Sequence, residues 1–495
     1  MKFLKSLKPP GRTPDVIVNP FSIMRSIDFT GWMLLLSGWL AWTMDGYDYF
    51  SVSLTAKRLS VQFGKSSTDI TTAITLTLLF RSVGAVIFGV AADRYGRKWT
   101  LVINLLLIAI FELGSSFCNT YQQFLAVRSL FGIAMGGIWG LAASTSLENI
   151  PPNARGLVSG FLQQGYAVGY LIAAVVNLTL VPNNPHTWRA LYWVGTGLSV
   201  FAAIFRSLLP ESRSFLEAKL EAKSRGDTGI SPTRAFLKEA KAMLKTNWKR
   251  AIWAVCLMTG FNFLSHASQD LLPLFLQDNK LFSPHNTSLI AIISNCGAVV
   301  GGITAGYFSQ YTGRRLAIII MLVWTGAFIP LWILPSSFAG ISAGVFFLQF
   351  GVQGAWGVVP IYLSESSPPA FRASFAGIAY QLGNMASAGS AQIEARGGEN
   401  WRTTVQGKNV PDYAKVQGVL LGVIIGWTLI MTLLGPENHG SRFEQAVATR
   451  EGAGKMRNED LVENHRVLQD DNAETGEAYD VKVKGNVEHV EKGAV

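Results

Sequence analysis

The sequence predicts an all-α polytopic membrane protein with twelve membrane-spanning helices in two pseudo-symmetric six-helix bundles. Of its 495 residues, 49% are hydrophobic and only 15% are charged, whereas soluble domains usually contain ~25% charged residues. The apolar residues gather in segments of about 20, long enough for a helix to cross roughly 30 Å of hydrocarbon. One long polar stretch divides these segments six and six.

Twelve segments have the length and composition of a membrane span. The first six cover residues 30–53, 68–91, 99–118, 121–147, 156–180 and 188–209, and the second six cover residues 250–277, 286–309, 315–334, 337–363, 372–394 and 415–435. Span four contains closely spaced glycines at Gly132, Gly136 and Gly140. Because small residues let helix backbones approach in a bilayer, we expect these glycines to serve packing.

The polar segments define the remaining domains. We expect an N-terminal cytoplasmic segment at residues 1–29, a first bundle at 30–209, a cytoplasmic linker at 210–249, a second bundle at 250–435 and a disordered cytoplasmic tail at 436–495. The linker alternates charged and apolar residues, which is typical of helices at a membrane surface. The tail is too charged to bury a core, and it is either a site for regulatory proteins or inert.

Lysine and arginine concentrate in alternate loops, and this asymmetry predicts the orientation. Basic residues cluster on one side of the membrane, so the positive-inside rule predicts that both termini are cytoplasmic. The net charge of +10 lies in these loops, which indicates anionic lipid as the partner rather than nucleic acid. The three cysteines lack paired spacing. With no phosphate loop or nucleophile–base pair, we predict no metal, no cofactor and no enzymatic activity.

The two halves repeat the same loop pattern. Residues 93–98 (DRYGRK) after span two match 310–315 (QYTGRR) after span eight, and 148–155 (ENIPPNAR) after span four matches 365–372 (ESSPPAFR) after span ten. Such internal duplication is typical of transporters. Acid–arginine pairs in these loops can hold one face shut. The predicted gating residues are Asp93, Arg94, Arg97, Arg128, Glu148, Arg155, Arg314, Glu365 and Arg372, where Arg128 is added from the outer part of span four.

These paired loops resemble the signature loops of the major facilitator superfamily, and the resemblance covers nearly the whole membrane region. It implies the major facilitator fold and alternating access of a central site. Gln310 stands where the second copy of the loop usually has an acid. We therefore expect a weaker latch in the C-terminal half.

Ionisable residues inside the spans are the main functional candidates, because burying charge in a membrane is costly. They are Asp45 and Asp48 in span one, Arg81 in span two, Glu112 in span three, Arg128 in span four, and His266 and Asp270 in span seven. Arg81 precedes Asp93 by about 18 Å of helix, which places it near mid-membrane. A guanidinium there can hold a carboxylate through two parallel hydrogen bonds. The alternative is an ion pair with Asp45, Asp48 or Glu112.

Span seven carries a polar stripe. Asn262, Ser265, His266, Gln269 and Asp270 are spaced three and four residues apart, so they share one helix face. A face this polar should line a central cavity rather than meet lipid. A histidine beside a carboxylate can exchange protons near neutral pH.

The stripe extends as Asn262-x-x-Ser265-His266-x-Ser268-Gln269-Asp270-x-x-x-Leu274. It is similar to the signature of the fungal Jen-type lactate/pyruvate permeases, Asn-x-x-Ser/Thr-His-x-Ser/Thr-Gln-Asp-x-x-x-Thr, except that Leu274 replaces the final threonine. The resemblance implies proton-coupled symport of monocarboxylates (lactate, pyruvate, acetate or propionate) across the plasma membrane. Some relatives prefer dicarboxylates such as succinate or malate. Other interpretations are a sugar or polyol:proton symporter and a non-transporting nutrient receptor.

Residues 45–48 (DGYD) resemble the first span of wider metabolite:proton symporters, and Gln381 and Asn384 in span eleven are similar to residues implicated in substrate recognition. The predicted substrate-binding residues are Arg81, Asn262, Ser265, His266, Gln269, Gln381 and Asn384. The predicted proton-coupling residues are His266, Asp270, Asp45 and Asp48.

Overall fold

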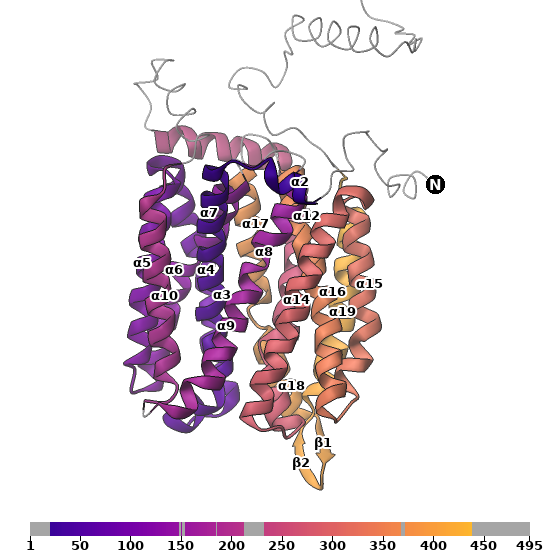
Figure 1. The fold of residues 1–495 in the computed structure, drawn as a ribbon. Helices are drawn as coiled ribbons and strands as arrows, with labels where there is room; N and C mark the ends of the chain where they lie inside the picture. The colour runs from indigo at the N-terminus through magenta and orange to yellow at the C-terminus, as the bar shows by residue number, and fades with distance from the viewer. Residues whose placement is uncertain are drawn as a thin grey trace, which may run out of the picture. The chain divides into compact units, whose positions relative to one another are not determined.

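Long helices running side by side make up almost all of the described chain (Figure 1). The computed structural model describes residues 20–147, 150, 154–184, 186–211, 232–367 and 372–437. All of them belong to the first of two compact units, Met1–Arg442. The prediction of an all-α chain built from two six-helix halves is confirmed.

The first half runs from α2 to α10. Its elements are α2 (Pro20–Arg25), α3 (Phe29–Phe63), α4 (Ser67–Tyr95), α5 (Arg97–Ser116), α6 (Tyr121–Met135), α7 (Ile138–Leu147), α8 (Arg155–Gln163), α9 (Gly165–Thr179), the 3₁₀-helix η2 (Val181–Asn183) and α10 (Arg189–Leu208). The predicted fourth and fifth spans are each broken into two helices, α6–α7 and α8–α9.

The second half runs from α12 to α19. Its elements are α12 (Pro232–Gln269), α13 (Leu272–Leu274), the π-helix η3 (Phe275–Asn279), α14 (Pro284–Thr312), α15 (Arg314–Ile333), α16 (Phe338–Ser366), α17 (Arg372–Ser387), α18 (Ser390–Asn400), β1 (Arg402–Val405), β2 (Lys408–Pro411) and α19 (Tyr413–Leu434). The eleventh span is the pair α17–α18.

Nine helices among the described residues are long and apolar enough to cross a membrane by composition alone. α3, α12 and the pair α17–α18 lie outside that set. These three spans carry the buried acids of span one, the polar stripe and the amides of span eleven. Their low hydropathy follows from side chains that face the protein interior, where polar groups in membrane proteins are found.

Local sequence signals explain several helix ends. Ser66 and Asp69 form a reciprocal capping box at the start of α4, and Thr120 and Gln123 form another at the start of α6. Gly64 ends α3 in the left-handed conformation, with φ 60°. α3 thereby continues ten residues beyond the predicted end of span one at residue 53.

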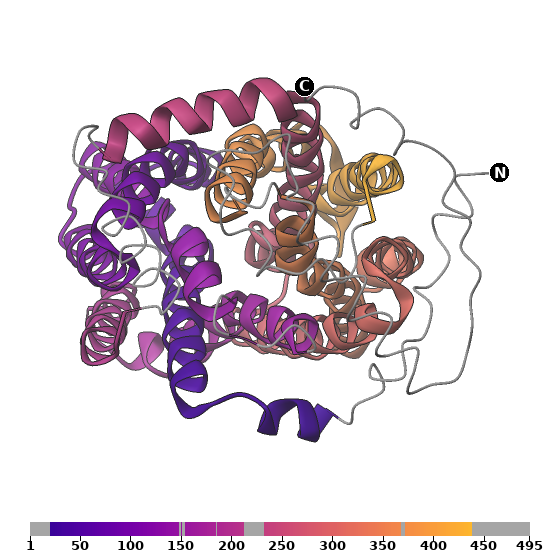
Figure 2. The same cartoon turned by 90° about the horizontal axis from the view of Figure 1, so that it is seen from above.

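α12 differs from the predicted seventh span, residues 250–277, at both ends. It begins at Pro232, inside the predicted linker, and bends at Asn247, where φ is −113° and ψ is 22°. Figure 2 shows its first part crossing the end of the bundle. Residues 212–231 of the linker lie outside the described residues. α12 ends at Gln269, close before Pro273, which cannot donate a backbone hydrogen bond.

A β-hairpin that the sequence analysis did not predict joins α18 to α19. β1 and β2 pair antiparallel, with Arg402 opposite Pro411 and Val405 opposite Lys408. The two turn residues, Gln406 and Gly407, both have positive φ, at 51° and 76°. Two positive values define the type I′ turn that matches strand twist. We call this end of the bundle the hairpin end and the opposite end the α2 end (Figure 1).

The halves contact each other differently at the two ends. At the hairpin end, side chains meet: Lys57 with Asp278 at 2.6 Å, Asn177 with Ser288 at 3.2 Å, and Gln392 with Thr72 at 3.1 Å. At the α2 end, Ser159 donates to the Gly357 carbonyl at 3.1 Å and accepts from the Ile361 N–H at 3.2 Å. There α8 and α14 pack so closely that a Cβ built on Gly306 would lie 2.8 Å from Gly160 Cα.

Gly84 tests the close packing of α4 on α6. A methyl group there would collide with the Ile133 carbonyl oxygen, whereas at Gly89 on the same helix it would meet nothing within 4 Å. We expect Gly84→Ala to destabilise the purified protein by about 1–3 kcal/mol, as overpacking does. Gly89→Ala should be neutral or stabilising, because alanine favours helix. Thermal unfolding in detergent measures both, and equal behaviour of the two variants would contradict this account of the packing.

Candidate functional site

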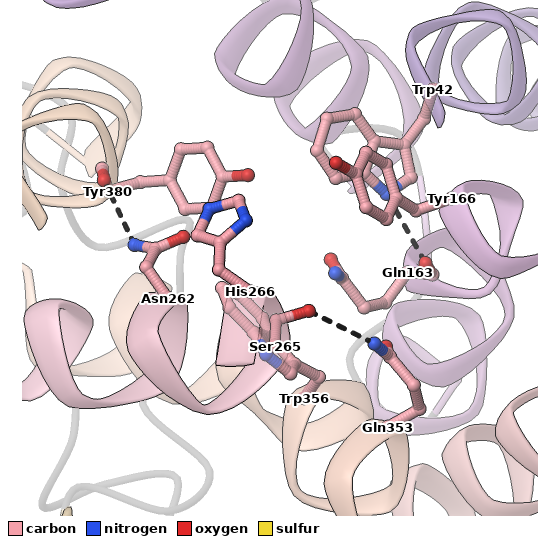
Figure 3. Close-up of a pocket in the computed structure, with 9 residues that line it drawn as sticks. All are labelled: Trp42, Gln163, Tyr166, Asn262, Ser265, His266, Gln353, Trp356 and Tyr380. Atoms are coloured by element: carbon pink, nitrogen blue, oxygen red, sulfur yellow. Dashed lines mark hydrogen bonds between the residues drawn. The ribbon is translucent and has the colours of Figure 1, made fainter. Parts of the chain in front are cut away.

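A small chamber is lined by residues from both halves (Figure 3). The space inside it that can hold the centre of a water molecule is only about 10 Å³, so side chains from the two halves nearly fill it. Its lining comprises Trp42 (α3), Gln163 (α8), Tyr166 (α9), Asn262, Ser265 and His266 (α12), Gln353 and Trp356 (α16), and Tyr380 (α17). Four aromatic rings and neutral polar side chains therefore surround it. No Lys or Arg is among these described lining residues.

The first three residues of the polar stripe face this chamber. Asn262, Ser265 and His266 line it, as the sequence analysis predicted for a central cavity. Ser265 donates to Gln269 Oε1 at 3.2 Å, and Gln353 donates to Ser265 at 3.4 Å. Gln269 is buried beyond the lining and donates to Gln349 Oε1 at 3.0 Å.

Tyr49 joins the stripe to the first half. Its hydroxyl donates to Asp270 Oδ2 at 2.8 Å and lies 3.2 Å from His266 Nδ1. His266 Nδ1 is also 3.1 Å from Asp270 Oδ2. These three side chains come from α3, α12 and the residue that directly follows α12, and they form a compact hydrogen-bonded group beside the chamber.

The proton position on His266 follows from a chain of amides. Gln381 Nε2 donates to the Gly136 carbonyl at 3.0 Å, and a carbonyl can only accept. Gln381 Oε1 therefore accepts from Asn384 Nδ2 at 3.1 Å, which turns Asn384 Oδ1 toward His266 Nε2 at 3.1 Å. Nε2 must carry a hydrogen to satisfy that oxygen. Nδ1, which faces Asp270 and Tyr49, is thus the ring nitrogen without a hydrogen in the neutral imidazole.

Arg81 lies behind the chamber wall rather than in its lining. It is fully buried and forms an ion pair with Asp45, the alternative that the sequence analysis left open. Its guanidinium carbon lies 5.7 Å from the centre of the Tyr49 ring. Tyr166 and Tyr380, which do line the chamber, are close enough to interact with it electrostatically. Arg81 Nε and Nη1 and Asp45 Oδ1 make no hydrogen bonds to the described residues.

Asp48 belongs to a different cluster from Asp45. Its Oδ2 accepts from Ser199 at 3.1 Å. Arg128 donates to Glu112 at 2.7 Å and to the Asp48 backbone carbonyl at 3.3 Å. The two aspartates are three residues apart on α3, and their carboxylates contact different helices.

The repeated loops form ion pairs and helix caps at the α2 end. Arg314 donates to both Glu365 carboxylate oxygens, at 3.0 and 3.1 Å, and to Gln310 at 3.3 Å. The Arg155 side chain donates to the Ile150 carbonyl at 3.1 Å. Arg97 begins α5 and is half-buried. Glu148 lies outside the described residues, as do the side chains of Asp93, Arg94 and Arg372.

After the last helix of each half, a glutamate accepts hydrogen bonds from the backbone at the start of another helix. Glu437 accepts from the backbone N–H groups of Arg314 and Arg315, at 2.9 and 3.0 Å, where α15 begins. Glu211 accepts from the Lys98 N–H at 3.0 Å, near the start of α5. A carboxylate is stabilised at a helix N-terminus. Each glutamate follows a proline, and this repeated Pro-Glu pair is the sequence signal.

Several functional candidates were missed from the sequence. Tyr49 directly follows the acidic pair of span one, but its partner on α12 is far away in the chain. Gln349 and Gln353 are four residues apart on span ten, a polar spacing that could have been recognised. The aromatic lining residues carried no distinguishing sequence signal, because aromatic residues occur throughout the spans.

Comparison with known proteins agrees with this architecture. Residues 32–391 match the family described as the Major Facilitator Superfamily. The chain is 35% identical to the carboxylic acid transporter protein homolog of Saccharomyces cerevisiae, over 85% of this chain and 70% of that protein. It is 25% identical to the cis,cis-muconate transport protein of Acinetobacter baylyi, over 71% and 84%.

A solved structure of the proton:xylose symporter XylE bound to 6-bromo-6-deoxy-D-glucose has a TM-score of 0.67 at 18% identity. The match covers 84% of this chain and 98% of that one, which shows a shared fold. The family match spans most of the membrane region and both halves. This chain is therefore a multi-pass membrane transporter that belongs to the Major Facilitator Superfamily.

Proposed function

We propose that this transporter imports short monocarboxylates, such as lactate, pyruvate, acetate and propionate, together with a proton. The observation that carries the proposal is the Tyr49 contact. Tyr49 lies against the buried Arg81–Asp45 pair and also bonds to His266 and Asp270. An anion-binding cation and a proton-exchanging pair are thereby linked across the two halves. The carboxylic acid transporter homolog among the relatives supports the same substrate class.

Arg81 is the proposed carboxylate ligand. Two of its nitrogens have no hydrogen-bond partner among the described residues, and buried donors without partners are costly. A substrate carboxylate can satisfy them if Tyr166 and Tyr380 move aside. Asn262, Ser265 and Gln269 complete the polar wall, while Gln381 and Asn384 act on the substrate through the orientation of His266.

The proton is proposed to bind at His266 Nδ1 and Asp270. One proton moving with one monocarboxylate carries no net charge, so the membrane potential does not oppose uptake. Each unit of pH difference then supplies about 1.4 kcal/mol, or roughly tenfold accumulation. We further propose that the chain lies in the plasma membrane with its α2 end, and both termini, in the cytoplasm, which agrees with the distribution of its basic residues.

The lining favours a monocarboxylate over a dicarboxylate. A second carboxylate needs a second cationic or strongly donating partner, and the described lining residues include no Lys or Arg. The neutral amides and aromatic rings are, however, groups that also suit a sugar. A sugar or polyol is therefore the competing substrate class.

Uptake measurements separate these alternatives. We expect radiolabelled lactate, but not succinate or glucose, to accumulate in cells that lack endogenous carriers and express this chain. Uptake should rise with acidic external pH and fall when an ionophore removes the proton gradient. Cells without the chain provide the background. Glucose uptake without lactate uptake would overturn the proposal, and succinate uptake would assign the dicarboxylate alternative.

A further inference from the structure

Glu394 is a buried carboxyl group outside the site described above. It lies on α18, the part of span eleven that leads to the hairpin end, and its exposed fraction is 0% (Figure 1). Asp45 and Glu112, two other fully buried acids, each pair with an arginine. The described hydrogen-bond partners of Glu394 are neutral: Ser390 donates to Oε1 at 3.1 Å, and Gln417 donates to Oε2 at 2.9 Å.

The absence of a cation among these partners favours reversible protonation. An ionised carboxylate in a membrane interior is costly unless it is paired. Two neutral donors offset only part of that cost. A carboxyl group in this position is therefore suited to bind a proton.

Gln417 gives the neutral form a partner as well. Its Oε1 is buried without a hydrogen-bond partner among the described residues. When Glu394 is ionised, Gln417 Nε2 donates to it, as the structure shows. When Glu394 is protonated, the Gln417 amide turned by 180° can accept the new O–H through Oε1. The same residues therefore accommodate both protonation states.

The surroundings of Glu394 connect it to the central site. α18 packs against α4, α12, α19 and β2. Asp270, which directly follows α12, is close enough to interact with Glu394 electrostatically, and so is Tyr413 on α19. α4 contributes the uncharged Thr72, which bonds to Gln392, and Lys408 of β2 is exposed. Since neighbouring carboxylates disfavour double ionisation, the charges of Glu394 and Asp270 depend on each other.

We propose that Glu394 is a second proton-binding site, coupled to Asp270 and placed between the chamber and the hairpin end. A hydronium ion transfers its proton to a carboxylate oxygen of Glu394, so that one O–H bond of hydronium breaks as the carboxyl O–H bond forms, and the proton returns to water by the reverse step. The inference builds on the proposed proton coupling. It predicts that the pH dependence of uptake reflects two carboxyl groups of the second half rather than the His266–Asp270 pair alone.

Glu394→Gln tests the site in the full-length protein, because glutamine keeps the shape but cannot titrate. Infrared spectroscopy of the purified, substrate-free protein should show a protonated-carboxyl band that disappears as pH rises. We expect this band to be lost in Glu394→Gln and retained, at a shifted position, in Glu394→Asp and Ser390→Ala. The half-maximal pH of uptake should move to more acidic values in Glu394→Gln, because a negative neighbour of Asp270 has been removed.

An unchanged infrared band in Glu394→Gln, or a half-maximal pH equal to that of the unmodified chain, would overturn the inference. If Glu394→Gln does not fold, Glu394→Asp takes its place in the test. Loss of the titrating band in Glu394→Asp would then overturn the inference. The infrared measurement needs no substrate. A titrating band in a protein that takes up no carboxylate would therefore refute the proposed function and leave the proton site standing.

Discussion

Arg81→Ala should reduce lactate uptake to background while the protein still reaches the membrane. The substitution removes the proposed carboxylate ligand and leaves Asp45 as a buried acid without its partner. Breaking a buried ion pair in this way also costs about 3–5 kcal/mol of folding stability, an effect separate from the loss of the ligand. Uptake of labelled lactate, normalised to surface protein, measures the effect. Arg81→Lys should also fail largely, because lysine lacks the planar donor pair.

A double variant separates substrate binding from charge pairing. If Arg81 served only to neutralise Asp45, then Arg81→Ala combined with Asp45→Asn would remove both charges and restore uptake. The proposed ligand role predicts instead that the double variant is stable but inactive. Recovery of uptake in the double variant would reduce Arg81 to an ion-pair partner.

His266→Gln should abolish the steep rise of uptake at acidic pH. His266 Nδ1 is the proposed proton-binding nitrogen, since the Asn384 oxygen accepts the hydrogen on Nε2. Glutamine can keep a bond to Asn384 but cannot take up a proton near neutral pH. We expect exchange of lactate across the membrane to persist, whereas accumulation driven by pH is lost, at roughly tenfold per pH unit. Counterflow and net uptake, compared in reconstituted vesicles, measure the two processes.

Tyr49→Phe is the matched control for this result. It removes the hydroxyl that contacts His266 and Asp270 but leaves both titratable groups in place. Its pH dependence should therefore be retained, although the affinity for substrate should fall. Equal pH profiles for His266→Gln and the unmodified chain would show that His266 only packs against its neighbours.

The sequence was informative wherever a property depends on residues close together in the chain. Apolar segment lengths and the duplicated loops predicted the helices and the division into halves. Helical spacing placed Asn262, Ser265 and His266 on one chamber-facing surface. The Arg314–Glu365 ion pair likewise joins residues from the repeated loops that were expected to interact.

Partners on different helices could not be predicted, because they depend on how the helices are packed. Arg81 had three possible acids, and only the structure assigns it to Asp45. The separation of Asp48 from Asp45, and the link from Tyr49 to α12, arise for the same reason. Glu394 was overlooked at the last position of a predicted span, where an acid normally indicates solvent rather than a buried group.

The unlike contacts at the two ends of the bundle imply unequal energy barriers to opening. At the hairpin end, separate side chains such as Lys57 and Asp278 can part by rotamer changes, and dissolved salt weakens an exposed ion pair. At the α2 end, glycines bring backbones together, so whole helices must separate before solvent enters. Rotamer changes occur in picoseconds to nanoseconds, whereas collective helix motions take microseconds to milliseconds. The slow step of the cycle should accordingly be the exposure of the chamber at the α2 end.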